Sequence, residues 1–129
     1  MTIRTLARWL LGLAFVTAGV PHFTRADIYL PMMPPYLPWP RELIFVSGLF
    51  EILGGLGVLW PTERIQRAAG LGLIALLVAV FPANLYMALN DVPMMGQHFP
   101  SAIRWGRLPL QLMLMAWAWW ATRPPEIRR

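Results

Sequence analysis

The side chains most capable of chemistry in this sequence are polar groups placed inside long apolar runs. Glu51 stands midway along the run from Leu43 to Thr62, with glycines close to it on both sides. A charged carboxylate at the centre of a bilayer is costly, so acids at such positions usually face a bundle interior and have a partner. Glu51 is therefore a candidate for ligand binding or proton transfer. The alternatives are a purely structural contact between helices and an acid that stays protonated.

Four further polar residues are expected in the outer half of the bundle, with Glu51 beneath them. His22 ends the first apolar run and Asn84 lies late in the third. Arg107 and Gln111 open the fourth run and share a helix face at i and i+4. Five polar groups at converging depth in so apolar a chain predict a ligand-binding pocket, with Glu51 paired to Arg107 or to His22. Each residue alone has a simpler interpretation, such as an interfacial histidine, a lipid-anchoring arginine or an amide that satisfies a carbonyl near a proline.

Composition indicates which elements position these residues. Hydrophobic residues make up 57% of the 129-residue chain and charged residues 13%, whereas charged residues are about 25% of an ordinary soluble domain. So apolar a surface favours an integral membrane protein. Because lipid offers no partner for an unpaired backbone amide, each span must be helical, and about 20 residues cross the hydrocarbon. We predict an all-α, transmembrane four-helix bundle, one membrane domain over residues 1–129, with spans at about 5–23, 42–60, 67–89 and 105–122.

The connections between the predicted spans differ in kind. Residues 24–40 contain five prolines together with many apolar residues. Proline removes a backbone donor and clashes with the preceding turn, so continuous helix is not expected there. This segment is predicted to be a proline-rich interfacial connection between helices 1 and 2 that caps the bundle. Residues 61–67 are predicted to be a short polar turn, and residues 91–104 a second long connection.

The distribution of arginine predicts the orientation. All 11 basic residues are arginine, and they are scattered between apolar runs, which does not suit nucleic-acid binding. Cytoplasmic loops carry an excess of positive residues. The bias predicts a multi-pass protein of the cell (inner) membrane with N- and C-termini cytoplasmic. Seven arginines fall on the side of the termini and the short turn (Arg4, Arg8, Arg64, Arg67, Arg123, Arg128, Arg129), and four on the other side (Arg25, Arg41, Arg104, Arg107).

Several chemistries have no signature in the sequence. The chain has no cysteine, which excludes disulfides, Fe–S clusters and cysteine-ligated zinc. Haem would usually need paired axial histidines, and the two histidines, His22 and His98, are both assigned outside the membrane core. No nucleophile constellation, phosphate loop or flavin signature is evident. We therefore predict no catalytic and no metal-binding residues.

An ordered set of motifs resembles the DoxX-like family of small membrane proteins. The resemblance covers nearly the whole chain and implies a four-helix membrane bundle. The family takes its name from a subunit of a thiosulfate:quinone oxidoreductase, and relatives are linked to oxidative-stress complexes and to chaperone-like or cargo roles. The five candidate pocket residues all lie within the motifs that carry the resemblance: Gly19–Phe23, Pro34–Pro38, Ser47–Gly55, Phe81–Met87 and Arg107–Gln111.

The leading hypothesis for function is a non-catalytic membrane component. It would bind a quinone, a lipid or another small amphiphile in the predicted pocket, or dock a redox partner subunit, with His22, Glu51, Asn84, Arg107 and Gln111 as the binding groups. One alternative is a quinone-linked oxidoreductase subunit in which Glu51 or His22 carries protons. Another is a small proton-coupled exporter, for which four helices are few unless the protein forms a homo-oligomer through small residues such as Gly54 and Gly55.

Overall fold

The computed structural model describes residues 1–93 and 97–124, which form helices joined by turns and loops, with no strand among them. The prediction of an all-α protein is therefore confirmed. Four of the helices are long and the rest lie in the connection between the first two long ones. The elements are α1 (Ile3–Gly19), α2 (Pro21–Thr24), α3 (Ala26–Tyr29), a 3-10 turn at Leu30–Met32, α4 (Pro40–Leu59), α5 (Glu63–Leu89) and α6 (Ser101–Ala121).

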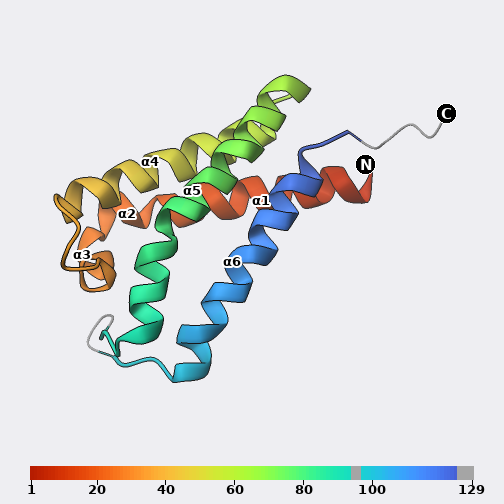
Figure 1. Ribbon diagram of the computed structural model, residues 1–129. Coiled ribbons are helices and arrows are strands. Elements are labelled where there is room, and N and C mark those ends of the chain that lie inside the picture. The colour runs from red at the N-terminus through yellow and green to blue at the C-terminus, as the bar shows by residue number, and fades with distance from the viewer. Residues whose placement is uncertain (94–96, 125–129) are drawn as a thin grey trace.

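The four long helices follow one another back and forth along the molecule (Figure 1). The most extensive packing is between α1 and α4, then between α4 and α5 and between α5 and α6, while α1 also touches α6. The start of α1, the turn between α4 and α5 and the end of α6 therefore lie at one end of the bundle. The connections from α1 to α4 and from α5 to α6 lie at the other.

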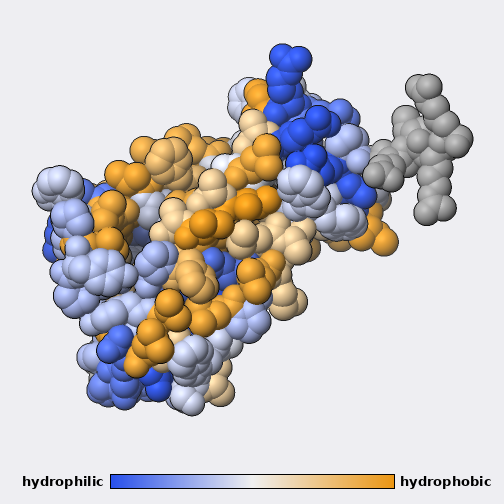
Figure 2. All heavy atoms as spheres, in the orientation of Figure 1, coloured by the Kyte–Doolittle hydropathy of each residue, from blue (hydrophilic) through white to orange (hydrophobic). Residues whose placement is uncertain are grey.

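Three segments are long and apolar enough to cross a membrane: Ile3–Thr24, Pro40–Leu59 and Glu63–Leu89. Only a small share of each is buried inside the protein, so large apolar side chains such as Leu13, Phe50 and Val78 face outward. Figure 2 shows hydrophobic atoms over the middle of one face and strongly hydrophilic atoms gathered at the end where α1 begins and α6 ends. An outward-facing apolar surface of this size fits a membrane protein. The crossing by α6 stays a prediction.

The helix boundaries differ from the predicted spans because hydropathy and helix length report different things. The predicted turn at 61–67 is wrong, since α5 begins at Glu63 and includes Arg64 and Arg67. The predicted connection at 91–104 is likewise too long, since α6 begins at Ser101. Hydropathy marks where lipid-compatible residues stop, whereas a helix continues through charged residues until its backbone is capped.

Glycines bring α1 and α4 into close contact. A Cβ built on Gly55 would lie 2.6 Å from the carbonyl oxygen of Gly12, and one on Gly19 would lie 2.8 Å from that of Gly48. Small residues on both helices thus allow a close approach beside Glu51. Gly54 faces Leu73 of α5. Gly54 and Gly55 thus pack against helices of the same chain, and the homo-oligomer stays a prediction.

The arginines near the termini bind helix ends, a role that the sequence analysis did not predict. Arg4 donates to the carbonyl oxygen of Trp120 at 2.8 Å, in the last turn of α6. Arg8 donates to the carbonyl oxygen of Val58 at 2.7 Å, in the last turn of α4. The last carbonyls of a helix have no partner within it, so these guanidinium groups satisfy them and also complement the helix dipole. Arg128 and Arg129, counted in the predicted orientation, lie outside the described residues.

The connection between α1 and α4 folds against the bundle. Its helical turns are short, as the prolines predict, and it ends at Trp39, which has a φ of 50° and precedes α4. Met32 of this segment is buried against Ala83 and Met87 of α5. Pro82 removes one hydrogen bond within α5, and Figure 1 shows α5 changing direction part-way along. The connection and α5 both contribute residues to the wall of a cavity, together with the other long helices.

Candidate functional site

A cavity of about 680 Å³ lies in the half of the bundle remote from the chain termini. All four long helices and the connection between α1 and α4 contribute to its wall. The wall is mostly apolar, with a few polar side chains from different elements. The five residues predicted from the sequence are all among those that line it: His22, Glu51, Asn84, Arg107 and Gln111.

Glu51 pairs with His22 across the contact between α2 and α4. The Nε2 atom of His22 and the Oε2 atom of Glu51 are 3.1 Å apart, and the two side chains are 11% and 16% exposed. The two atoms are within ion-pair distance, and Oε2 has no other partner among the described residues. Of the two predicted charge pairs, the structure contains the one with His22. Gly48 makes it possible, because a Cβ there would collide with the His22 side chain.

The protonation of this pair follows from the atoms that His22 contacts. The Nδ1 atom lies 3.0 Å from the carbonyl oxygen of Ala18. A carbonyl only accepts, so Nδ1 carries a proton. If Nε2 and Oε2 both lacked a proton, two lone pairs would face each other at 3.1 Å. The contact therefore holds one proton, either on Glu51 or on His22, and the pair is neutral overall in both forms.

A chain of amide hydrogen bonds joins α5 to α6 on the opposite wall. The side-chain nitrogen of Asn84 donates to the side-chain oxygen of Gln111 at 2.7 Å. Gln111 in turn donates to the carbonyl oxygen of Leu77 at 2.6 Å. Gln111 is 4% exposed, and a buried amide must find partners. The amide that satisfies a carbonyl near Pro82 is thus Gln111, not Asn84 as the simpler interpretation had it.

Arg107 presents a positive charge to the cavity. One terminal nitrogen of its guanidinium contacts the sulfur of Met87 at 3.0 Å, and the other lies 3.4 Å from the side-chain oxygen of Asn84. Both partners are neutral, and a thioether is a weak acceptor. Among the described residues Arg107 forms no ion pair. The charge of Arg107 is therefore held at the wall without a counter-charge.

Sequence reasoning missed two polar neighbours of the cavity. The ring of Tyr29 stacks on that of His22, with centroids 4.1 Å apart. Burial raises the pKa of the Tyr29 phenol above its usual value, so the hydroxyl is a neutral donor. Ser47 also lines the cavity. Tyr29 was counted with the apolar residues of the connection. Its hydroxyl could have indicated a site residue, because a buried tyrosine usually places this group against a polar partner.

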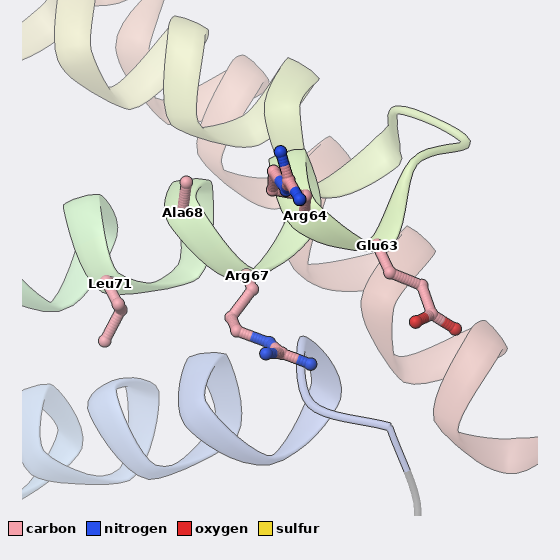
Figure 3. A pocket seen from close by; sticks show the side chains of 5 residues that line it. All are labelled: Glu63, Arg64, Arg67, Ala68 and Leu71. Carbon is pink, nitrogen blue, oxygen red and sulfur yellow. The ribbon is translucent and has the colours of Figure 1, made fainter.

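A second, smaller hollow lies at the opposite end, near the start of α5. It measures about 370 Å³ and is lined by Glu63, Arg64, Arg67, Ala68 and Leu71. Figure 3 shows the charged side chains spreading in different directions, with Arg67 reaching toward the last turn of α6. These side chains do not converge on a common point, and all five residues are exposed. The cavity beside Arg107 is the better candidate for a site.

Comparison with known proteins adds a family but no activity. The model of a family described as a domain of unknown function (DUF8561) matches residues 11–122. No curated protein matches the chain, and no solved structure matches it.

Proposed function

The chain belongs to the family of the domain of unknown function DUF8561, and we propose that it is a membrane protein that binds a small amphiphile in the cavity between α1, α4, α5 and α6. The observation that carries the proposal is the wall of that cavity. Ligand sites are typically about 300–1,000 Å³, mostly apolar, with a few placed polar groups. At about 680 Å³ the cavity has this character.

Exposed residues on the cavity wall support a ligand drawn from the bilayer. Phe50 of α4 and Leu110 of α6 line the cavity and are each about half exposed on the outer, apolar surface. An amphiphile in lipid could therefore enter sideways between the helices. Its chain would contact apolar side chains and its headgroup the polar ones. A quinone and a lipid both have this construction.

We include α6 as a fourth membrane-spanning helix in this proposal. It has 21 residues, and at about 1.5 Å per residue a helix of that length spans the hydrocarbon. Its inner arginines contact protein, since Arg104 donates to the carbonyl oxygen of Ala88 and Arg107 to Met87. Its outward-facing residues include Leu112 and Met113. Charges that face inward in this way are the usual arrangement in membrane bundles.

The remaining parts of the sequence hypothesis belong to the same proposal. Five arginines lie at the end of the bundle that holds the start of α1 and the end of α6, which supports cytoplasmic termini. The DoxX-like resemblance stays a prediction; residues of its motifs line the cavity. A role beside a redox partner stays a prediction of that resemblance. The arginines concerned are Arg4, Arg8, Arg64, Arg67 and Arg123.

Cavity-filling variants test the binding of an amphiphile. Ala79 of α5 lines the cavity, whereas Ala75, one turn earlier on the same helix, does not. Protein is purified in a mild detergent, and the small molecules that stay bound are counted by native mass spectrometry. Ala79→Trp should lose the bound amphiphile and Ala75→Trp should keep it. Equal retention by both folded variants, or no bound molecule in the unaltered protein, would refute the proposal.

The protonated contact between His22 and Glu51 favours one second candidate, a quinone-linked oxidoreductase subunit. That contact holds a proton at the cavity wall, where a reduced quinone oxygen would need one. Membranes containing the protein are mixed with thiosulfate and a soluble benzoquinone, and quinol formation is followed by absorbance. A faster rate than with Glu51→Gln membranes would support this role, and equal rates would exclude it.

A further inference from the structure

We propose that the cavity selects amphiphiles whose headgroup is an oxyanion, a carboxylate or a phosphate, and that Arg107 binds this headgroup. The inference rests on the proposed function, because it names the class of ligand for the same cavity. It follows from the charges of the polar groups on the wall, taken one at a time.

The contacts of Arg107 leave its charge unbalanced. A guanidinium has five N–H donors arranged for a planar oxyanion. Here its side-chain partners are the sulfur of Met87 at 3.0 Å and, at the long distance of 3.4 Å, the oxygen of Asn84. A neutral thioether and a neutral amide leave the charge unbalanced. A charge held away from water without a partner is costly, and an anionic ligand would remove that cost.

Glu51 is the acid on the cavity wall that could otherwise balance the charge of Arg107. Glu51 lines the same cavity, but it stands 3.1 Å from His22. Because His22 uses its other nitrogen to donate to the Ala18 carbonyl, the contact with Glu51 holds one proton and the pair is neutral. The cavity therefore has one net positive charge, located on Arg107.

A chain of two amides holds Arg107 in place. Asn84 accepts from Arg107, donates to Gln111, and Gln111 donates to the Leu77 carbonyl. Both amides donate away from Arg107, Asn84 to the Gln111 side chain and Gln111 to the backbone of α5. The chain fixes both amides in the orientation that offers an oxygen to the guanidinium. It positions Arg107 and uses one of its donors, and the contact with Met87 uses a second, so the remaining N–H donors are available to a ligand.

The apolar wall of the cavity would contact the rest of the ligand. Apolar side chains surround the polar groups, and several of them come from α5 and α6 near Arg107. A headgroup at Arg107 would thus continue into a hydrocarbon chain that contacts these residues. They include Leu76, Leu77, Val80, Leu110 and Leu114. A free inorganic anion would gain nothing from this wall, whereas an anionic amphiphile would use both parts.

Three probes of equal chain length test the proposal in maltoside micelles, which carry no anionic group. They are palmitate, hexadecyl phosphate and methyl palmitate, and binding is titrated by native mass spectrometry. Hydrogen bonds to charged groups are worth about 1.5–3 kcal/mol, so Arg107→Met should weaken the two anions by roughly tenfold or more. Binding of the methyl ester should change little. Arg104→Met is the matched control, because Arg104 lies one turn away on α6 and does not line the cavity.

The outcomes separate the selection of anionic headgroups from the binding of amphiphiles in general. Tighter binding of the anions than of the ester, lost in Arg107→Met and kept in Arg104→Met, supports the charge-based selection. Equal binding of acid and ester, or equal loss of both in Arg107→Met, overturns the selection and leaves amphiphile binding intact. Absence of binding by all three probes, or binding unchanged in Ala79→Trp, overturns the proposed function and this inference with it. The relative strength of palmitate and hexadecyl phosphate separates a carboxylate from a phosphate ligand.

Discussion

The close contact between α1 and α4 at Gly12 and Gly55 can be tested by replacing glycine with alanine. The replacement should lower the free energy of unfolding at this contact and should not lower it at an open helical site. In Gly55→Ala the new methyl group would lie 2.6 Å from the Gly12 carbonyl oxygen and 3.0 Å from the Val16 backbone nitrogen. Both are backbone atoms, which cannot rotate away. Ordinary van der Waals contact begins at 3.4 Å, so the two helices must separate locally by the difference of about 0.8 Å.

The size of the effect follows from this displacement. Overpacking a close contact costs about 1–3 kcal/mol, and replacing a helical glycine by alanine returns about 1 kcal/mol of helix propensity. Gly55→Ala should therefore lower the free energy of unfolding by up to about 2 kcal/mol, which is the overpacking cost less the propensity gain. Gly72→Ala is the matched control, because a Cβ there meets no atom within 4 Å. That variant has only the propensity gain, so it should be as stable as the unaltered protein or slightly more stable.

Unfolding by titration with dodecyl sulfate in mixed micelles, followed by the helical circular dichroism signal, measures both variants under one condition. A clear separation of the two midpoints, with Gly55→Ala the less stable, is the expected result. If the two variants unfold at the same midpoint, the backbones of α1 and α4 are not in the close contact described at Gly12, and the reasoning about small residues in this bundle is wrong.

Three further predictions use the same protein. Gln111→Leu removes two buried hydrogen bonds and strands the Asn84 amide, so it should lower the free energy of unfolding by about 1–3 kcal/mol in the same titration; an unchanged midpoint would contradict the bonded chain. Arg8→Met leaves the Val58 carbonyl without its donor, and amide exchange in the last turn of α4 should become faster there but not in α5. Burial raises the pKa of Tyr29, so its folded form keeps the proton longer and stability should fall as pH rises past about 10. Tyr29→Phe should have a shallower fall, and identical pH profiles would exclude that cause.

Much of the candidate site could be predicted from the sequence because polar residues are rare in the apolar runs. Glu51, Asn84 and Gln111 each interrupt such a run, and lipid leaves a polar side chain no partner except protein. The depth of a residue along a span is also nearly fixed, since each residue of a helix rises by 1.5 Å. The similar depth of the five residues within the bundle is therefore recoverable from their spacing.

The identity of the partners was decided by the tertiary structure. Spacing left Glu51 equally able to meet Arg107 or His22, because it gives depth and not the direction a helix faces. The close approach of α1 and α4 at Gly19 and Gly48 brings His22 to Glu51, and the packing of α5 on α6 sets Asn84 beside Arg107. Tyr29 joined the site through the fold of the connection, which no periodicity predicts.

The same division holds for the ends of the chain. The number and approximate position of apolar runs follow from composition, because the bilayer imposes one length and one secondary structure on each. The role of Arg4 and Arg8 as partners for the carbonyls that end α6 and α4 depends on which helix termini meet in space. The sequence indicates that an arginine lies near a helix end. Only the packing of the helices determines which helix supplies the carbonyl that the arginine contacts.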